Sequence, residues 1–141
     1  MLKQSVVRTM LAISLGAIAG ALSRYYLGLS FHHLLGAETS LSTLVINLTG
    51  CFGMGLLATL SLGQGRVIHP DVRLMLLTGF LGSYTTFSSY ELESANLLAQ
   101  HRLGAHLLYW VGSTVLGFLS LESGIALARW FQGQLDRDWS P

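Results

Sequence analysis

The stretch that decides the fold is RLMLLTGFLGSYTTFSSYELES, residues 73–94. Its first part, Arg73–Gly82, is apolar enough for half of a membrane helix, whereas Ser83–Ser94 is rich in hydroxyl groups and holds two carboxylates. A continuous lipid-facing helix would not carry so many polar groups, because non-helical or polar backbone at membrane depth needs protein or a water-filled cavity around it. Broken helices near the bilayer midplane are also where transporters place ion sites. We therefore predict a broken helix, with a short helix and a polar loop as the alternative.

The composition of the whole chain identifies lipid as the main solvent. Of its 141 residues, 51% are apolar and only 11% are charged, and the mean hydropathy is +0.53. A soluble domain usually has about one quarter charged residues. The net charge of +1, from scattered Lys and Arg, argues against a nucleic-acid binder. The single cysteine, Cys51, excludes an internal disulfide and a CxxC-type metal site, and its apolar surroundings predict a small buried hydrophobe.

Four stretches are long and apolar enough to cross a bilayer, which takes about 20 residues. They are approximately Val6–Phe31, Leu41–Leu62, Val72–Gln100 and Leu107–Phe131. The first stretch could also be a signal peptide, but it is longer than a typical signal core and three more spans follow it. The joining segments are short, so we expect residues 1–141 to form a single all-α membrane domain. It has four transmembrane helices, the third broken near its middle.

Glycines predict close packing between these helices. Gly16 and Gly20 form a GxxxG motif, and Arg24 continues the same row at four-residue spacing. Further glycines crowd the second and fourth spans, namely Gly50, Gly53, Gly55, Gly112 and Gly117. Glycine is common in membrane helices, so each one alone is weak evidence. Together they predict four tightly packed helices and an oligomer.

Uncharged polar side chains form a column of hydrogen-bond donors inside the spans. Asn47, on one face with Thr43, is either a clasp to a neighbouring helix or a donor to a passing anion. In the fourth span Tyr109, Ser113 and Ser120 form a polar stripe, although such hydroxyls often bond to their own helix backbone. Such a column, without a mid-membrane lysine, suits an anion that must lose water and yet not be trapped by a fixed charge.

The charged and titratable residues indicate neither an enzyme nor a metal centre. Arg24 either snorkels to the membrane interface or forms a positive vestibule that attracts anions. Glu122 lies inside the fourth span, and the sequence assigns it no partner. The histidines form no ligand motif with the carboxylates, and no Ser–His–Asp or paired-carboxylate arrangement is evident. They lie in loops or at helix ends, at positions 32, 33, 69, 101 and 106.

These motifs together resemble one known family. GFLGSYTTFSSYELES, Gly79–Ser94, resembles the GFxGxxTTFSTF signature of the Fluc, or CrcB-type, fluoride channels. The Gly16-x-x-x-Gly20-x-x-x-Arg24 row is similar to the first helix of that family, and NLTGCFGMG from Asn47 is similar to the second. The spacing of Tyr109 and Ser113 is similar to that in the fourth helix, so the resemblance covers nearly the whole chain.

The resemblance implies an antiparallel, dual-topology homodimer with two fluoride pores. It also implies a structural Na⁺ at the centre of the dimer, bound by the backbone carbonyls of Gly82 and Thr85 from both subunits. Carbonyl oxygens at the ends of half-helices suit a hard cation.

The resemblance also implies which residues line the pores. Asn47, Tyr109 and Ser113 would be donors, and Phe87 would present the positive edge of its ring to the anion. This chain has Tyr90 where the family has a second Phe, so it keeps the ring edge and adds a hydroxyl. Ser89 replaces a Thr, and Glu93 matches a carboxylate near the pore mouth.

The expected function is passive export of cytoplasmic fluoride across the bacterial plasma (inner) membrane, which gives fluoride resistance. One alternative is a small multidrug-resistance-type exporter, which needs a membrane-embedded Glu in its first helix; the first span here has no carboxylate. The other is a non-transporting membrane assembly protein.

The distribution of positive charge bears on the dimer. By the positive-inside rule, an excess of Lys and Arg on one side favours a single orientation. One side would carry Lys3, Arg8, Arg66, Arg73, Arg129 and Arg137, and the other Arg24 and Arg102. We expect a homodimer nevertheless, with paired subunits as the alternative.

Overall fold

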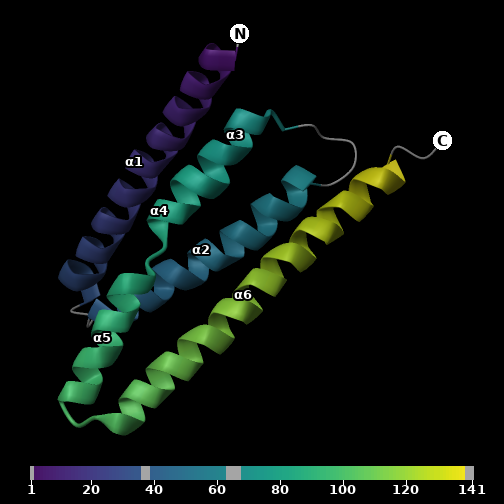
Figure 1. Cartoon of the computed structure of the whole chain (residues 1–141). Helices are drawn as coiled ribbons and strands as arrows, with labels where there is room; N and C mark the ends of the chain where they lie inside the picture. The colour runs from purple at the N-terminus through teal and green to yellow at the C-terminus, as the bar shows by residue number, and fades with distance from the viewer. Residues whose placement is uncertain (1, 36–38, 63–67, 139–141) are drawn as a thin grey trace.

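The computed structural model describes residues 2–35, 39–62 and 68–138, and every regular element in these ranges is a helix. In chain order the elements are α1 (Leu2–Leu35), α2 (Thr39–Leu62), α3 (Pro70–Leu74), η1 (Met75–Leu81), α4 (Gly82–Tyr84), α5 (Phe87–Ala99) and α6 (Leu103–Asp138). Figure 1 shows α1 and α6 as the outer long helices, with α2 and the interrupted α3–α5 helix between them. α1, α2 and α6 are each long and apolar enough to cross a membrane. The predicted four-helix membrane fold is confirmed.

The third helix is interrupted close to the place that the sequence predicts. Helical backbone continues two residues past Gly82 to Tyr84, and then becomes extended at Thr85 (φ −79°, ψ 157°) and Thr86 (φ −145°, ψ 121°). The polar stretch beyond the break is helix α5, not a loop, because Thr86 caps it by accepting a hydrogen bond from the Ser89 amide (3.3 Å). The π-helical turns of η1 were not predicted, since no hydrophobic period signals them.

Backbone-to-backbone contacts hold the helices together at glycines. A Cβ added to Gly16 would lie 2.1 Å from the Met75 carbonyl oxygen of η1, and one added to Gly20 would lie 2.2 Å from that of Phe80. In the other main pairing, α2 with α6, a Cβ on Gly55 would lie 2.2 Å from the Leu121 oxygen. The predicted glycine packing is thus confirmed at these three positions. It is wrong for Gly112, whose added Cβ would have nothing within 4 Å.

One ion pair ties the start of α3 to α1. Asp71 is buried, and its carboxylate lies 2.5 Å from Arg8 Nε and accepts a hydrogen bond from the Thr9 hydroxyl (2.7 Å). The Asp71 amide donates to His69 Nδ1 (3.2 Å), which caps the helix. Asp71 precedes the third predicted span. The Thr9 hydrogen bond, with the charges of Arg8 and His69, holds the pKa of Asp71 below its ordinary value against the opposing effect of burial.

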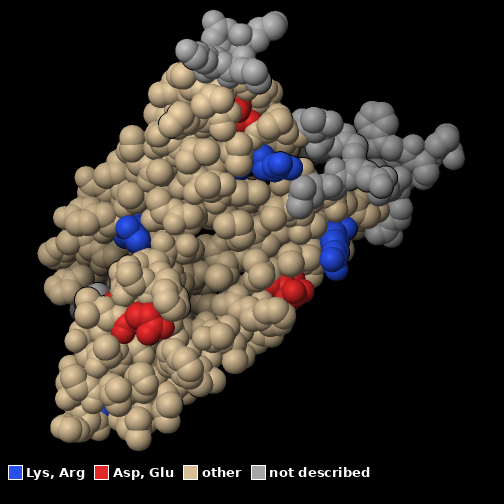
Figure 2. Space-filling model, viewed as in Figure 1, with Lys and Arg blue, Asp and Glu red and all other residues tan. Residues whose placement is uncertain are grey.

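The outer surface suits a lipid environment. Large apolar side chains are exposed along α1 and α6, among them Leu15, Ile18, Leu108 and Phe118. Figure 2 shows charged side chains as few and well separated on this face. A soluble monomer rarely exposes so much contiguous apolar surface. The positive-inside prediction used the distribution of Lys and Arg between the two sides. Of the residues in that prediction, Arg66 and the side chains of Lys3 and Arg137 lie outside the described residues.

We predict that Gly124→Ala destabilises the protein by about 1–3 kcal/mol, because overpacking a close contact costs about that much. Its Cβ would lie 2.2 Å from the Phe52 carbonyl oxygen of α2, and backbone cannot move aside. Gly133→Ala on the same helix is the matched control, since its Cβ meets nothing within 4 Å. Thermal unfolding of the detergent-purified protein measures both. Equal melting temperatures for the two variants would contradict the packing argument.

We predict that Asp71→Asn lowers the melting temperature at pH 7 and that this difference shrinks as the pH falls. A carboxyl group whose pKa is depressed by folding contributes stability above its ordinary value of about 3.9, and loses it as the pH falls through the lower folded value. Melting curves between pH 7 and pH 3 test this. Glu122→Gln, at an exposed carboxylate, is the control. A difference that stays constant across this range would rule out the ion pair as its cause.

Candidate ion pathway

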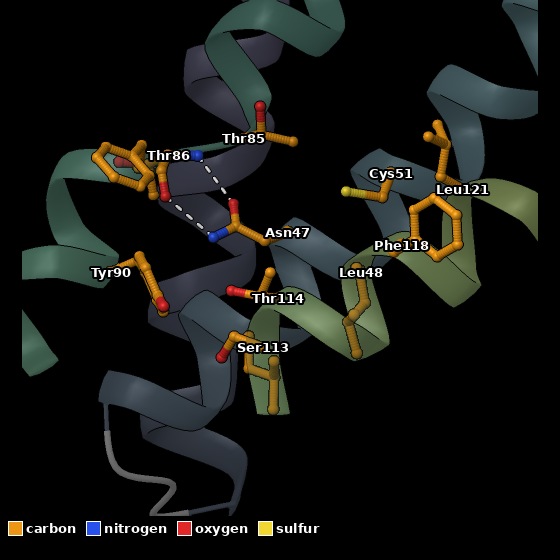
Figure 3. Close-up of a pocket in the computed structure, with 13 residues that line it drawn as sticks. Asn47, Leu48, Cys51, Thr85, Thr86, Tyr90, Ser113, Thr114, Phe118 and Leu121 are labelled. Atoms are coloured by element: carbon orange, nitrogen blue, oxygen red, sulfur yellow. Dashed lines mark hydrogen bonds between the residues drawn. The ribbon is translucent and has the colours of Figure 1, made fainter. Parts of the chain in front are cut away.

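Asn47 clasps the break in the third helix. Its side-chain Oδ1 accepts a hydrogen bond from the Thr86 amide (2.8 Å), and its Nδ2 donates to the Thr86 carbonyl (3.0 Å). Figure 3 shows this reciprocal pair as dashed lines. An NH₂ group has two protons, and the clasp uses one of them. The two interpretations of Asn47, clasp or donor, are therefore compatible with each other.

The clasp also redirects the backbone around the break. In an uninterrupted helix the Thr86 amide would donate to the Gly82 carbonyl, four residues earlier, but here it donates to Asn47. The Thr85 carbonyl accepts a long hydrogen bond from the Arg24 guanidinium (3.4 Å). A carbonyl has a second lone pair, so this contact does not use up its capacity. Backbone oxygens turned out of a helix ladder at a break are ligands of the kind that a hard cation such as Na⁺ takes.

A pocket of about 390 Å³ adjoins the clasp, between α2, α5 and α6. Four of the predicted pore residues line it: Asn47, Phe87, Tyr90 and Ser113. Figure 3 shows Asn47, Tyr90 and Ser113 around this space. Ser113 Oγ is buried, and the described residues offer it no hydrogen-bond partner. A buried hydroxyl without a partner is rare and needs an explanation, such as an absent ion or water.

The hydroxyls around the pocket differ in what they bind. Thr114, which lies next to the predicted stripe, donates to the Trp110 carbonyl of its own helix (3.0 Å). Ser120 instead donates across to the Leu48 carbonyl of α2 (2.7 Å). Of the stripe residues, Ser113 alone is left with an unpartnered oxygen within the described chain. The structure thus singles out one member of the predicted stripe, which periodicity could not do.

Aromatic rings continue from the pocket along α5 and α6. The Phe87 side chain is 74% exposed on the single chain, whereas Tyr90 is 7% exposed. The Phe87 and Tyr90 ring centroids lie 5.8 Å apart, and those of Tyr90 and Tyr109 lie 5.3 Å apart. The Tyr90 hydroxyl donates to the Trp110 carbonyl (2.8 Å). The hydroxyl that distinguishes this chain from the family signature therefore fixes the Tyr90 ring against α6.

Glu93 joins three helices beside a second pocket of about 320 Å³. Its carboxylate accepts the Tyr109 hydroxyl (2.7 Å) and the Thr43 hydroxyl (2.8 Å), one on each oxygen. Tyr109 and Ser113 both line this second pocket, so Ser113 belongs to both spaces. The sequence placed Thr43 on the face of Asn47 but gave no sign of its pairing with Glu93, which lies 50 residues away.

A third pocket, of about 410 Å³, contains Arg24. Thr86 lines both this pocket and the first, so the helix break separates the two spaces. Arg24 turns towards the break, and does not snorkel away from it, because its guanidinium reaches Thr85. The predicted site residues thus gather around the break, while Glu122 is exposed on α6. Within the described chain, no group of three or more His, Cys, Asp or Glu side chains could hold a metal ion.

Known proteins resemble this chain over most of its length. The family model described as "CrcB-like protein, Camphor Resistance (CrcB)" matches residues 11–125. A protein of Trichormus variabilis, named "Fluoride-specific ion channel FluC", is 50% identical over 129 residues, which cover 92% of this chain and 94% of that protein. Proteins of the same name from a Synechococcus species and from Chloroflexus aurantiacus are 49% and 43% identical, over 87% and 90% of this chain and 94% and 100% of theirs. A family match over most of the length, on a four-helix fold with a clasped break, leads to one conclusion: the chain belongs to the CrcB family of membrane proteins.

Proposed function

We propose that this protein is a fluoride-specific ion channel that releases cytoplasmic fluoride passively. The observation that carries the proposal is the buried, unpartnered Ser113 hydroxyl, in a pocket shared with Asn47 and the Phe87 and Tyr90 rings. Two relatives named as fluoride-specific channels, 50% and 49% identical over 94% of their length, support the identity of the ion. A channel is not an enzyme class, and this function needs no catalytic residue.

The pocket chemistry suits a small, hard anion. Ser113 offers one hydroxyl proton, and Asn47 keeps one amide proton beyond its clasp. The ring edges of Phe87 and Tyr90 carry partial positive charge. Neutral donors replace part of the hydration of the ion without holding it as a fixed positive charge would, so it can leave again. Tyr109, in ring contact with Tyr90, continues the aromatic wall of the path, while its hydroxyl donates to Glu93.

The driving force is the membrane potential. With the cell interior negative, exit of an anion is favoured by about 2.3 kcal/mol per 100 mV for each charge. Arg24 lies in its own pocket on the other side of Thr86 and raises the local anion concentration as a positive vestibule. The bacterial plasma membrane is the proposed location, because cytoplasmic fluoride must leave across it.

The proposed active form is an antiparallel homodimer. On the single chain, Phe87 and Gly82 are exposed beside the break, where a second copy would cover them. Gly82 and Thr85 are the proposed Na⁺ ligands, since the clasp takes the amide that would otherwise occupy the Gly82 carbonyl. A bound Na⁺ would balance the carbonyl dipoles of the two copies and tie them together.

We predict that Ser113→Ala slows fluoride efflux about 10- to 100-fold, because a hydrogen bond to a charged partner contributes about 1.5–3 kcal/mol. Its melting temperature stays unchanged or rises, since the hydroxyl has no protein partner to lose. A fluoride electrode measures efflux from liposomes that contain the purified protein. Ser123→Ala is the control on the same helix, where the hydroxyl bonds to its own Leu119 carbonyl. Equal efflux from both variants would remove Ser113 from the pathway. No efflux from the wild-type protein would favour the assembly-protein alternative.

We predict that Tyr90→Phe conducts fluoride at nearly the wild-type rate but loses about 1 kcal/mol of stability, the usual contribution of one hydrogen bond. The ring edge remains, while the bond from the hydroxyl to the Trp110 carbonyl is lost. Melting temperature and liposome efflux are measured on the same preparation. Tyr26→Phe, at an exposed tyrosine of α1, is the control. If Tyr90→Phe abolished efflux without loss of stability, the hydroxyl would be a conducting group and not an anchor.

A further inference from the structure

A row of residues at four-residue spacing runs along the second half of α1 and changes its role partway. Gly16 and Gly20 pack against the backbone of η1. The row continues with Arg24, Gly28 and His32, and all three line the third pocket. Positions four apart lie on one face of a helix. Each step of four residues turns the row by about 40° around the helix, so beyond Gly20 it leaves the third helix and lines a polar cavity instead.

Gly28 keeps the space between the two basic residues open. A Cβ added to it would have nothing within 4 Å, unlike the glycines earlier in the row. Arg24 and His32 are eight residues apart, which is about 12 Å along a helix axis. Both can therefore act on one ion in the cavity of about 410 Å³.

The side chains of the rest of the cavity wall are uncharged. α2 contributes Ser42 and Thr43, although the Thr43 hydroxyl already donates to Glu93, and the cap and first turn of α5 contribute Thr86 and Ser89. No carboxylate is among the described residues that line it. Such a cavity recruits small anions, and its charge depends on the protonation of the histidine.

We propose that His32 is a second cationic group of this vestibule, which when protonated recruits fluoride to the channel beside Arg24. This inference rests on the proposed fluoride-channel function and adds a residue that the sequence analysis left in a loop. Histidine ordinarily titrates with a pKa near 6.5. When His32 is protonated, it adds positive charge to the pocket and raises the rate of anion entry.

The charged and polar groups around His32 determine the electrostatic effect of its protonation. On α1 they are Arg24, Tyr25 and the His33 ring, which meets the His32 ring edge-on at 5.6 Å but does not line the cavity. From α2 and α5 the facing side chains that line the cavity bear hydroxyls, except for the apolar Ile46. Behind Thr43, the Glu93 carboxylate is held by two hydroxyls. Glu38 lies outside the described residues, so the experiment includes the variant Glu38→Gln.

The size of the effect follows from one charge acting across a hydrated pocket. At separations near 8 Å in a water-like dielectric, we expect fluoride entry to rise about two- to fivefold. Salt screens such an interaction over about 8 Å at 0.15 M ionic strength. The increase should therefore be largest at low ionic strength, which a purely structural role of His32 would not produce.

The test is fluoride efflux from liposomes that contain the full-length protein, at pH 7.5 and 5.5, with the leak of protein-free liposomes subtracted. We expect the wild-type rate to rise two- to fivefold at pH 5.5. His32→Gln should stay at the lower rate at both pH values, and His32→Lys should run at the higher rate at both. His33→Gln, the matched neighbour, should keep the wild-type pH dependence, and so should Glu38→Gln.

Two results would overturn the inference. One is an equal increase in wild type and His32→Gln at low salt; the other is an increase in wild type that Glu38→Gln abolishes. In either case efflux itself remains, so the channel function stands. Efflux no faster than from protein-free liposomes, in wild type at both pH values, would instead overturn the proposed function.

Discussion

The structure depends on the reciprocal hydrogen-bonded pair between the Asn47 amide and the Thr86 backbone. A helix that breaks inside a bilayer leaves N–H and C=O groups that have no water to bind, and each costs several kcal/mol if unsatisfied. Asn47 satisfies both groups of Thr86 at once, at 2.8 and 3.0 Å. The Thr86 side chain then caps α5. One side chain from α2 thus makes it possible for the third helix to end and begin again at membrane depth.

Other contacts hold the half before the break in place beside this clasp. Ser83, just before the break, donates to the Ala17 carbonyl of α1 (2.8 Å), and the Tyr84 hydroxyl pairs with Thr49 of α2 (2.9 Å). Glycine contacts bring α1 close enough for the Ser83 bond, since even a methyl group on Gly20 would overlap the Ser83 hydroxyl. The helix end before the break is therefore fixed to both α1 and α2. A fixed break presents the same donors and carbonyls to an ion each time, which is what a selective pathway requires.

Most of the hydroxyls inside the spans have hydrogen-bond partners within the protein, and this explains why a polar column is compatible with a stable membrane protein. Most of them bind backbone carbonyls: Thr114 and Ser123 on their own helix, and Ser120 on a neighbouring one. Because these hydroxyls donate their proton to a carbonyl, they have none left to offer to an ion. Ser113 differs because its oxygen faces a pocket where the described chain supplies no acceptor. The candidate site is thus marked by what remains unsatisfied after the fold has formed.

The sequence by itself determined the membrane class, the four helices and the approximate place of the break, because hydropathy and the run of hydroxyl residues act locally. It also identified Asn47, Ser113 and the aromatic pair as candidates, although that selection drew on a family signature. Only the tertiary structure decided that Asn47 is a clasp, that the Tyr90 hydroxyl anchors its ring to α6, and that Glu93 pairs with Thr43 and Tyr109. It likewise placed Arg24 and His32 in one cavity and revealed the π-helical turns of η1. The physical reason is that hydropathy is a property of each segment, whereas a hydrogen bond exists only when packing brings a particular donor and acceptor from distant segments within about 3 Å.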